Sequence, residues 1–165
     1  MIRKAYTHVL TYAPVVNSDE DFRRFAAAAA KVLLTWFTAW PEAREAFDGT
    51  GDVPADSVIR ILTSSLADEE KMRILTERWT ARKGVVVYAG FKDVLCVLQD
   101  PVNDDSIGIN RISNGTDRCP AANLLSLAVC ALAESMLPSV SLGTTENSDV
   151  INAALALIRK AGFSV

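Results

Sequence analysis

The pattern of apolar and polar residues predicts a chain built mainly from short helices. Ser18 and the three acidic residues after it are typical of a helix start, and apolar residues at helical spacing continue to Trp40, where Pro41 ends the helix. The same criteria predict the next helices: a short one over 42–47, one over 57–65, and one that begins at Asp68 and stops at Gly84.

The second half of the chain continues this pattern around one β-rich segment. That segment, 85–88, consists of three valines and a tyrosine, which favour a short strand. Helical spacing then predicts three further helices, over 91–98, 121–136 and 150–161. The polar segment 99–108, rich in Asp, Asn and Pro, is predicted to be a linker. The first fifteen residues alternate only weakly and are expected to form an extended arm.

Two pairs of segments indicate an internal repeat. Residues 49–59 align with 115–125 at an offset of 66, with Gly, Thr, Pro and Ala matched. Residues 86–91 align with 150–155 at an offset of 64. Both matches occur in the same order at nearly the same offset, which favours two related lobes. Chance similarity between alanine-rich helices is the alternative.

The loop sequences resemble a known family. The segment 47–53, Phe-Asp-Gly-Thr-Gly-Asp-Val, precedes a predicted helix and an acidic helix start, and it resembles a hand of calmodulin and the myosin light chains. Gly84, Val86, Tyr88 and Phe91 match the places of the turn glycine, the β-bridge residue and two aromatic residues in the next hand of that family. The resemblance covers roughly residues 42 to 98 directly, and residues 110 to 161 through the internal repeat.

The resemblance implies an all-α, α-rich fold of paired EF-hand-like helix–loop–helix lobes with short loop-to-loop β bridges, plus an extra N-terminal helix. In such lobes Val53 would bridge to Val86, and Cys119 to Val150. The division that follows is an N-terminal arm and helix at 1–41, a first lobe at 42–98, a linker at 99–109 and a second lobe at 110–165.

The same comparison argues against a calcium site. In the family, a bidentate carboxylate closes each loop and completes a shell of six to eight oxygens. The corresponding residues here are Ser57, Gly90, Asn123 and Ala154, none of which is acidic. The second loop also contains an arginine and a lysine, which repel a cation. We therefore expect no metal and no cofactor.

Composition narrows the class of protein further. The chain has 165 residues, 50% of them hydrophobic and 22% charged, which favours a buried core over disorder. A net charge of −3 provides no basic field for nucleic acid. The longest apolar stretch, 25–40, is interrupted by Lys31 and is too short to span a membrane. Without an apolar run after the charged first residues, we expect no secretory signal and a cytoplasmic location.

Candidate catalytic chemistry is sparse. The single histidine, His8, lies near no GxSxG motif, and the chain contains neither GxGxxG nor a phosphate-binding loop. We expect His8 to be a partly exposed surface or edge histidine and the protein to be non-enzymatic. Cys96, Cys119 and Cys130 are odd in number, form no CxxC pair and lie in apolar runs, as reduced, buried thiols usually do.

The resemblance implies a calmodulin-like light chain or adaptor that binds a basic amphipathic helix without calcium. The partner would be a motor, such as a myosin neck, or a scaffold protein, with a cytoskeletal association as one option. The overall acidity favours a basic partner. Apolar residues of the predicted helices are the candidate lining of the helix-binding groove, with ordinary core as the alternative for each: Phe47, Ile61, Leu62, Met72, Leu75, Phe91, Leu95, Leu124, Leu127, Leu132, Met136, Leu155 and Ile158.

Two other functions remain open at this point. One is an α-rich structural or assembly protein, viral or cytoskeletal, that self-associates. The other, weaker alternative is a binding domain for a small apolar ligand.

Overall fold

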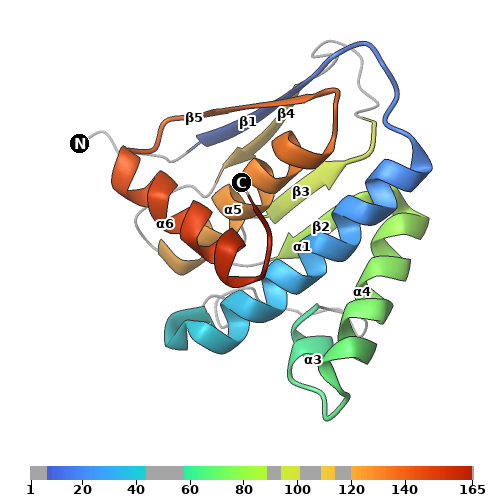
Figure 1. The fold of residues 1–165 in the computed structure, drawn as a ribbon, viewed down its shortest axis with the longest axis vertical. Coiled ribbons are helices and arrows are strands. Elements are labelled where there is room, and N and C mark those ends of the chain that lie inside the picture. Colours follow the sequence, from blue (N-terminus) through green and yellow to red (C-terminus); the bar gives the residue numbers. More distant parts are fainter. Residues whose placement is uncertain (1–6, 44–57, 89–93, 101–108, 114–119, 165) are drawn as a thin grey trace.

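Short strands are interspersed among the helices along the chain (Figure 1). The computed structural model describes residues 7–43, 58–88, 94–100, 109–113 and 120–164. The elements are β1 (Thr7–Tyr12), α1 (Asp19–Ala39), the 3-10 turn η1 (Pro41–Ala43), α3 (Val58–Leu62), α4 (Asp68–Arg82), β2 (Gly84–Tyr88), β3 (Val94–Leu98), β4 (Ile109–Ser113), α5 (Pro120–Met136), β5 (Val140–Thr144) and α6 (Ser148–Lys160).

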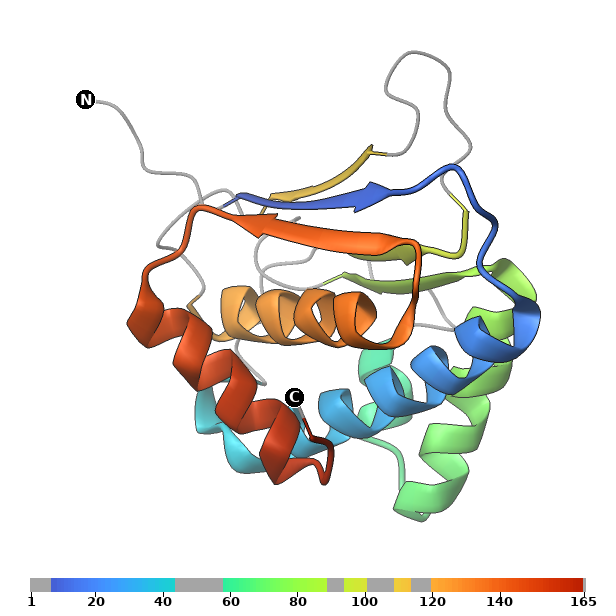
Figure 2. The ribbon, with the colours of Figure 1, turned by 45° about the horizontal axis from the view of Figure 1, so that its top comes forward.

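The strands form a layer on one side of the helices (Figure 2). β1 is the middle strand of an antiparallel sheet with the order β4-β1-β5, and β2 and β3 form a separate antiparallel pair. His8 lies opposite Thr144 of β5, and Leu10 lies opposite Leu142. Along β1, His8, Leu10 and Tyr12 are buried while Thr11 is exposed, so one face of the strand points to the helices.

Local sequence signals explain where the long helices begin. The Ser18 side chain accepts a hydrogen bond from the backbone N–H of Asp21, and Asn147 caps α6 in the same way through Val150. Both helices have acidic residues in the first turn, where the helix dipole favours them. These signals need no tertiary contact, and they fix the direction in which each helix leaves its loop.

The core lies between the sheet and the helices. α1 packs against α4, α5 and α6, and its Trp36 indole N–H donates to the carbonyl of Ala121 in α5 over 3.0 Å. In α5 every residue from 121 to 130 is buried, because the sheet covers one side of this helix and α1 and α6 cover the other. β1 belongs to the same core through Leu10, which is fully buried.

The all-α fold of paired EF-hand-like lobes is wrong, because the described residues form a mixed α/β fold with five strands. Residues 94–98 are a strand where a helix was predicted: Leu95 and Val97 are buried and alternate with half-buried Cys96, which is the period of a strand. The predicted β bridges are also wrong where they can be checked. Val86 pairs with Cys96, and Val150 lies in the first turn of α6. Val53 and Cys119 lie outside the described residues.

Several predicted elements are confirmed. α1, α4, α5 and α6 match the predicted helices to within a few residues, and β2 matches the predicted β-rich segment. α3 is shorter than the helix predicted over 57–65. The weakly alternating arm contains β1, the middle strand of the sheet, and most of the short helix predicted over 42–47 lies outside the described residues. Within the described part of the chain, no helix has the length and apolar character needed to cross a membrane.

Candidate functional site

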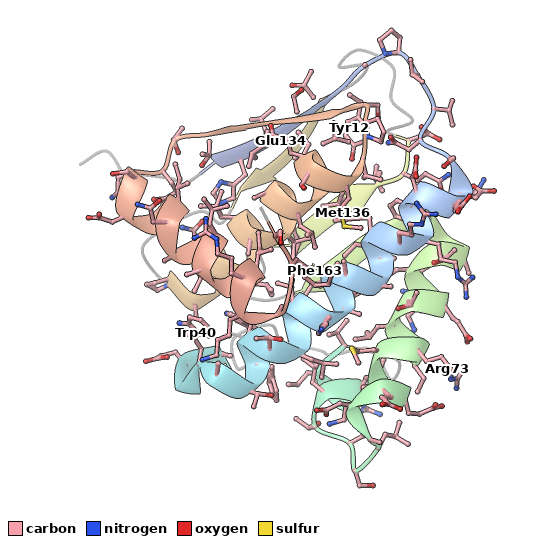
Figure 3. All side chains as sticks on the ribbon, in the orientation of Figure 1. Tyr12, Trp40, Arg73, Glu134, Met136 and Phe163 are labelled. Atoms are coloured by element: carbon pink, nitrogen blue, oxygen red, sulfur yellow. The ribbon has the colours of Figure 1, made fainter. Side chains whose placement is uncertain are left out.

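A shallow groove follows the outer side of α1. It is bounded by α4 on one side and by Met136 and Phe163 on the other, and Figure 3 labels both of these residues beside α1. We call it the α1 groove. Its main part has a volume of about 640 Å³ and is lined by Arg23, Arg24, Ala27, Ala28, Lys31, Glu69, Met72, Arg73, Thr76, Glu77, Met136 and Phe163.

A second hollow extends the α1 groove toward the end of α1. Its volume is about 330 Å³, and it shares Lys31 and Met72 with the first. The remaining residues that line it are Leu34, Thr35, Thr38, Ala39, Asp68 and Lys160. Because Arg23 and Ala39 are sixteen positions apart on one helix, the whole groove is about 24 Å long, or a little more than four turns of a helix.

The shape of the α1 groove follows from the residues on the outer stripe of α1. Ala27 and Ala28 lie near the middle of this stripe and have the smallest side chains that a helix favours, so the surface of α1 is low there. Met72 of α4 and Met136 of α5 rise beside it and are partly buried. Methionine side chains are flexible and polarisable, which suits a surface that adapts to an apolar partner.

Positive charges predominate in the lining of the α1 groove. Among the described residues, five cationic and three acidic side chains line it, although the whole chain has a net charge of −3. Arg24 is paired with Glu20 over 2.5 Å, and Arg73 is paired with Glu70 and Glu77. These pairs are exposed and contribute little to stability.

The two lysines of the groove lie over aromatic rings. The Lys31 Nζ atom is 5.5 Å from the centroid of the Phe163 ring, and the Lys160 Nζ atom is 5.8 Å from that of Trp40. An aromatic ring holds a cation in place without neutralising it. Both lysines therefore keep a positive charge that a bound partner can reach.

A second polar cluster is buried between the sheet and α5. The Nε2 atom of His8 is 2.8 Å from Asn123 Oδ1, and the Asn123 side-chain amide donates to Glu146 Oε1 over 2.8 Å. The Nδ1 atom of His8 is 2.9 Å from the hydroxyl of Thr144, which accepts a hydrogen bond from the Glu146 backbone N–H over 3.2 Å. The four residues thus form a closed cycle of hydrogen bonds, which we call the His8 cycle.

The direction of each hydrogen bond in the His8 cycle follows from the acceptor on Asn123. Because Asn123 Oδ1 only accepts, the proton of His8 is on Nε2, and the hydroxyl of Thr144 donates to Nδ1. Burial lowers the pKa of His8, although Asn123 and Glu146 act in the opposite direction, so the neutral ring is favoured. Both ring nitrogens are hydrogen-bonded within the protein, and the His8 side chain is fully buried.

One oxygen of Glu146 has no hydrogen-bond partner in the described part of the chain. Glu146 is 9% exposed, and the oxygen concerned is its buried Oε2 atom. Its other oxygen is held by Asn123, the fourth residue of α5, so the carboxylate lies near the positive end of that helix. The helix dipole stabilises a negative charge at this place. We interpret the His8 cycle as a structural connection between β1, α5 and β5.

Most of the predicted groove residues lie in the core. Those that are buried are Ile61, Leu62, Leu75, Leu95, Leu124, Leu127, Leu132 and Ile158. Met72, Met136 and Leu155 are partly buried, and of these Met72 and Met136 line the α1 groove. Phe47 and Phe91 lie outside the described residues. The structure therefore brings two of the thirteen candidates to one groove and places eight in the core.

The sequence reasoning missed the α1 side of the groove and the position of His8. The sequence does contain a signal for the groove that was overlooked. It is the outward-facing stripe of α1, in which Ala27 and Lys31 are one helical turn apart. His8 was expected to be partly exposed, but it is fully buried in the middle strand. Burial raises the pKa of the Cys96 and Cys130 thiols, and Cys119 lies outside the described residues.

Among the described residues, no three His, Cys, Asp or Glu side chains are grouped as metal ligands would be. Comparison of the chain with protein-family models, curated proteins and solved structures finds no match. A relationship to the EF-hand family therefore stays a prediction.

Proposed function

We propose that the protein is a non-enzymatic binding module whose α1 groove holds an apolar, acid-flanked segment of a partner protein. The observation that carries this proposal is the α1 groove itself, an open channel about 24 Å long with methionines at its sides and unneutralised lysines along it. A helix of about four turns fits this length, and helix-in-groove binding uses anchors at such spacing.

The charge of the lining supports an acidic flank on the bound segment. Lys31 and Lys160 keep their charge over aromatic rings, and Arg23 lines the same channel. Carboxylates on the partner would lie beside these cations while its apolar side chains contact Met72 and Met136. The basic partner helix expected from the overall charge stays a prediction, and the experiment below distinguishes the two.

The His8 cycle supports the non-enzymatic part of the proposal. General-base catalysis requires a ring nitrogen that a substrate can reach, and the His8 side chain is fully buried. The described thiols, those of Cys96 and Cys130, have raised pKa values, which disfavours the reactive thiolate.

The test uses two synthetic helical peptides of about sixteen residues, which match the groove in length. Both carry the same leucine stripe, and the flanks of the stripe are glutamates in one peptide and lysines in the other. Binding is measured by calorimetry and located by chemical-shift changes in the protein. We expect the acidic peptide to bind more tightly and to shift residues of α1 and α4. Preference for the basic peptide would overturn the charge argument, and shifts outside the α1 groove would overturn the site.

A matched pair of variants locates the effect. Ala27→Glu places a carboxylate in the α1 groove, one helical turn from both Arg23 and Lys31. The larger side chain fills part of the groove, and its negative charge neutralises these two cations. The helix should stay folded, because the new glutamate would form favourable i,i+4 pairs with both residues. Ala153→Glu makes the same change at an exposed position of α6 outside the lining. We expect Ala27→Glu to weaken the acidic peptide at least about tenfold, or 1.4 kcal/mol. Ala153→Glu should leave the affinity unchanged.

A further inference from the structure

The connection between β1 and α1 exposes a short apolar segment. It consists of residues 13–16, Ala-Pro-Val-Val, all of them exposed, and we call it the β1–α1 tip. Val15 is 67% exposed and Val16 is 73% exposed, which is more than any other large apolar side chain among the described residues. The tip lies at a corner of the molecule in Figure 1, between the end of β1 and the start of α1. Single exposed apolar residues are ordinary, but here two of the three exposed large apolar side chains of the described residues are adjacent in the chain.

Hydrogen bonds hold the tip at both ends. The backbone N–H of Ala13 donates to the carbonyl of Ser139 over 2.7 Å. After the tip, the buried side chain of Asn17 donates to the carbonyl of Gln99 over 2.9 Å and accepts from the Ser139 hydroxyl over 2.6 Å. Proline and two β-branched valines restrict the segment further. The tip is therefore held at both ends, which lowers the conformational entropy that it would lose on binding.

Acidic residues flank the tip. Asp19, Glu20 and Asp21 form the first turn of α1 after Asn17 and Ser18, and Asp100 follows Gln99, to which the base of the tip is bonded. Within the molecule Asp19 accepts a hydrogen bond from Gln99 and the exposed Glu20 pairs with Arg24, so part of this acidic turn is already paired. An apolar segment followed by an acidic helical turn is the chemistry that the α1 groove is proposed to hold. The tip does not fill the groove of its own molecule, because both valines are exposed.

We infer that the α1 groove of one copy of the chain holds the β1–α1 tip of a second copy. This inference rests on the proposed function, since it names an occupant for the same groove. Val15 and Val16 would contact the methionines of the groove, and the acidic turn would lie beside Lys31 and Lys160. Because the tip and the groove are different surfaces, two copies either exchange tips in a closed pair or continue in a chain.

The test measures the mass of the full chain in solution by sedimentation equilibrium, over a range of concentrations. The tip variant combines Val15→Ser with Val16→Ser and keeps the groove, and the groove variant Ala27→Glu keeps the tip. Ala153→Glu is the control, and thermal unfolding checks that each variant is folded. We expect the average mass of the wild type to rise above the monomer value of 17.9 kDa as the concentration increases. In 0.5 M salt, which screens the charges, this rise should be several-fold less steep. Each variant alone should remain monomeric.

The decisive measurement is an equimolar mixture of the tip variant and the groove variant. The intact tip of one then meets the intact groove of the other, so we expect a 1:1 complex from two proteins that do not self-associate. A mixture that stays monomeric, or a wild type that stays monomeric at millimolar concentration, would overturn the inference. If the wild type is monomeric but the acidic peptide binds the α1 groove, this inference fails and the proposed function stands. If neither binds, both fail.

Discussion

At the scale of residues, the His8 cycle makes the strongest stability prediction. Asn123 contacts both His8 and Glu146, so Asn123→Ala leaves a buried ring N–H and a buried carboxylate oxygen without partners. Each such group costs about 1–3 kcal/mol, so we expect the free energy of unfolding to fall by about 2–6 kcal/mol in urea titrations. Asn152→Ala, at an exposed position of α6, is the control and should change it by less than about 0.5 kcal/mol. A loss below 1 kcal/mol for Asn123→Ala would contradict the cycle.

His8 also predicts a pH dependence of stability. Burial lowers its pKa in the folded state below the ordinary 6.5, so the unfolded chain binds the proton more readily. The contribution of His8 to the free energy of unfolding is therefore complete above pH 6.5 and is lost as the pH falls through the folded pKa. Because the chain has one histidine, a proton NMR titration reads that pKa directly. A measured pKa of 6.5 or higher, or the same pH dependence in His8→Gln, would refute this account.

The position of His8 illustrates what residue patterns leave open. Its partners, Asn123 and Thr144, are 115 and 136 positions away in the chain. A lone histidine in a weakly alternating segment gives no sign of them, and an edge strand and a central strand of this length look alike in sequence. Burial of His8 becomes visible only when β5 and α5 are placed beside β1.

At the scale of elements, β5 shows how an exposed sheet edge is blocked. β5 is an edge strand, and its Leu142 N–H donates to the Glu134 side chain of α5 over 2.6 Å, while the Val140 N–H donates to Leu137. We expect Glu134→Ala to uncover a free donor and to increase aggregation, measured by light scattering on mild heating. Glu134→Gln retains an acceptor oxygen and should behave like the wild type. Equal aggregation of both variants would attribute the effect to charge rather than to the hydrogen bond.

The elements that the sequence predicted correctly are those with local signals. The caps of α1 and α6 and the acidic starts of α1 and α4 lie within a few residues of the helices that they begin. β3 was predicted as a helix because a five-residue run of apolar side chains fits both periods. The pairing of β3 with β2 shows that it is a strand. The five residues between the two strands include Gly90, which is a hairpin signal that the helical interpretation overlooked.

At the scale of the whole molecule, α1 connects the parts of the chain. It packs against α4 from the first half and against α5 and α6 from the second, and β1 lies between β4 and β5. The α1 groove could not be predicted for the same reason, because its lining comes from α1, α4, the end of α5 and Phe163. Sequence patterns identified each of these helices, but their arrangement depends on packing between distant segments.

The same connections predict how the molecule unfolds. The division into two lobes with a linker at 99–109 stays a prediction, and it would give two transitions, whereas packing around α1 favours one. Gln99 lies at the start of that linker but is 4% exposed, and its amide donates to the carbonyl of Asn17 and to Asp19. Gln99→Ala should therefore lower the single calorimetric transition by about 3–10 °C, as expected for a loss of 1–3 kcal/mol in a chain of this size. Two separate transitions, or no shift relative to Asn152→Ala, would show that the lobes unfold independently of this contact.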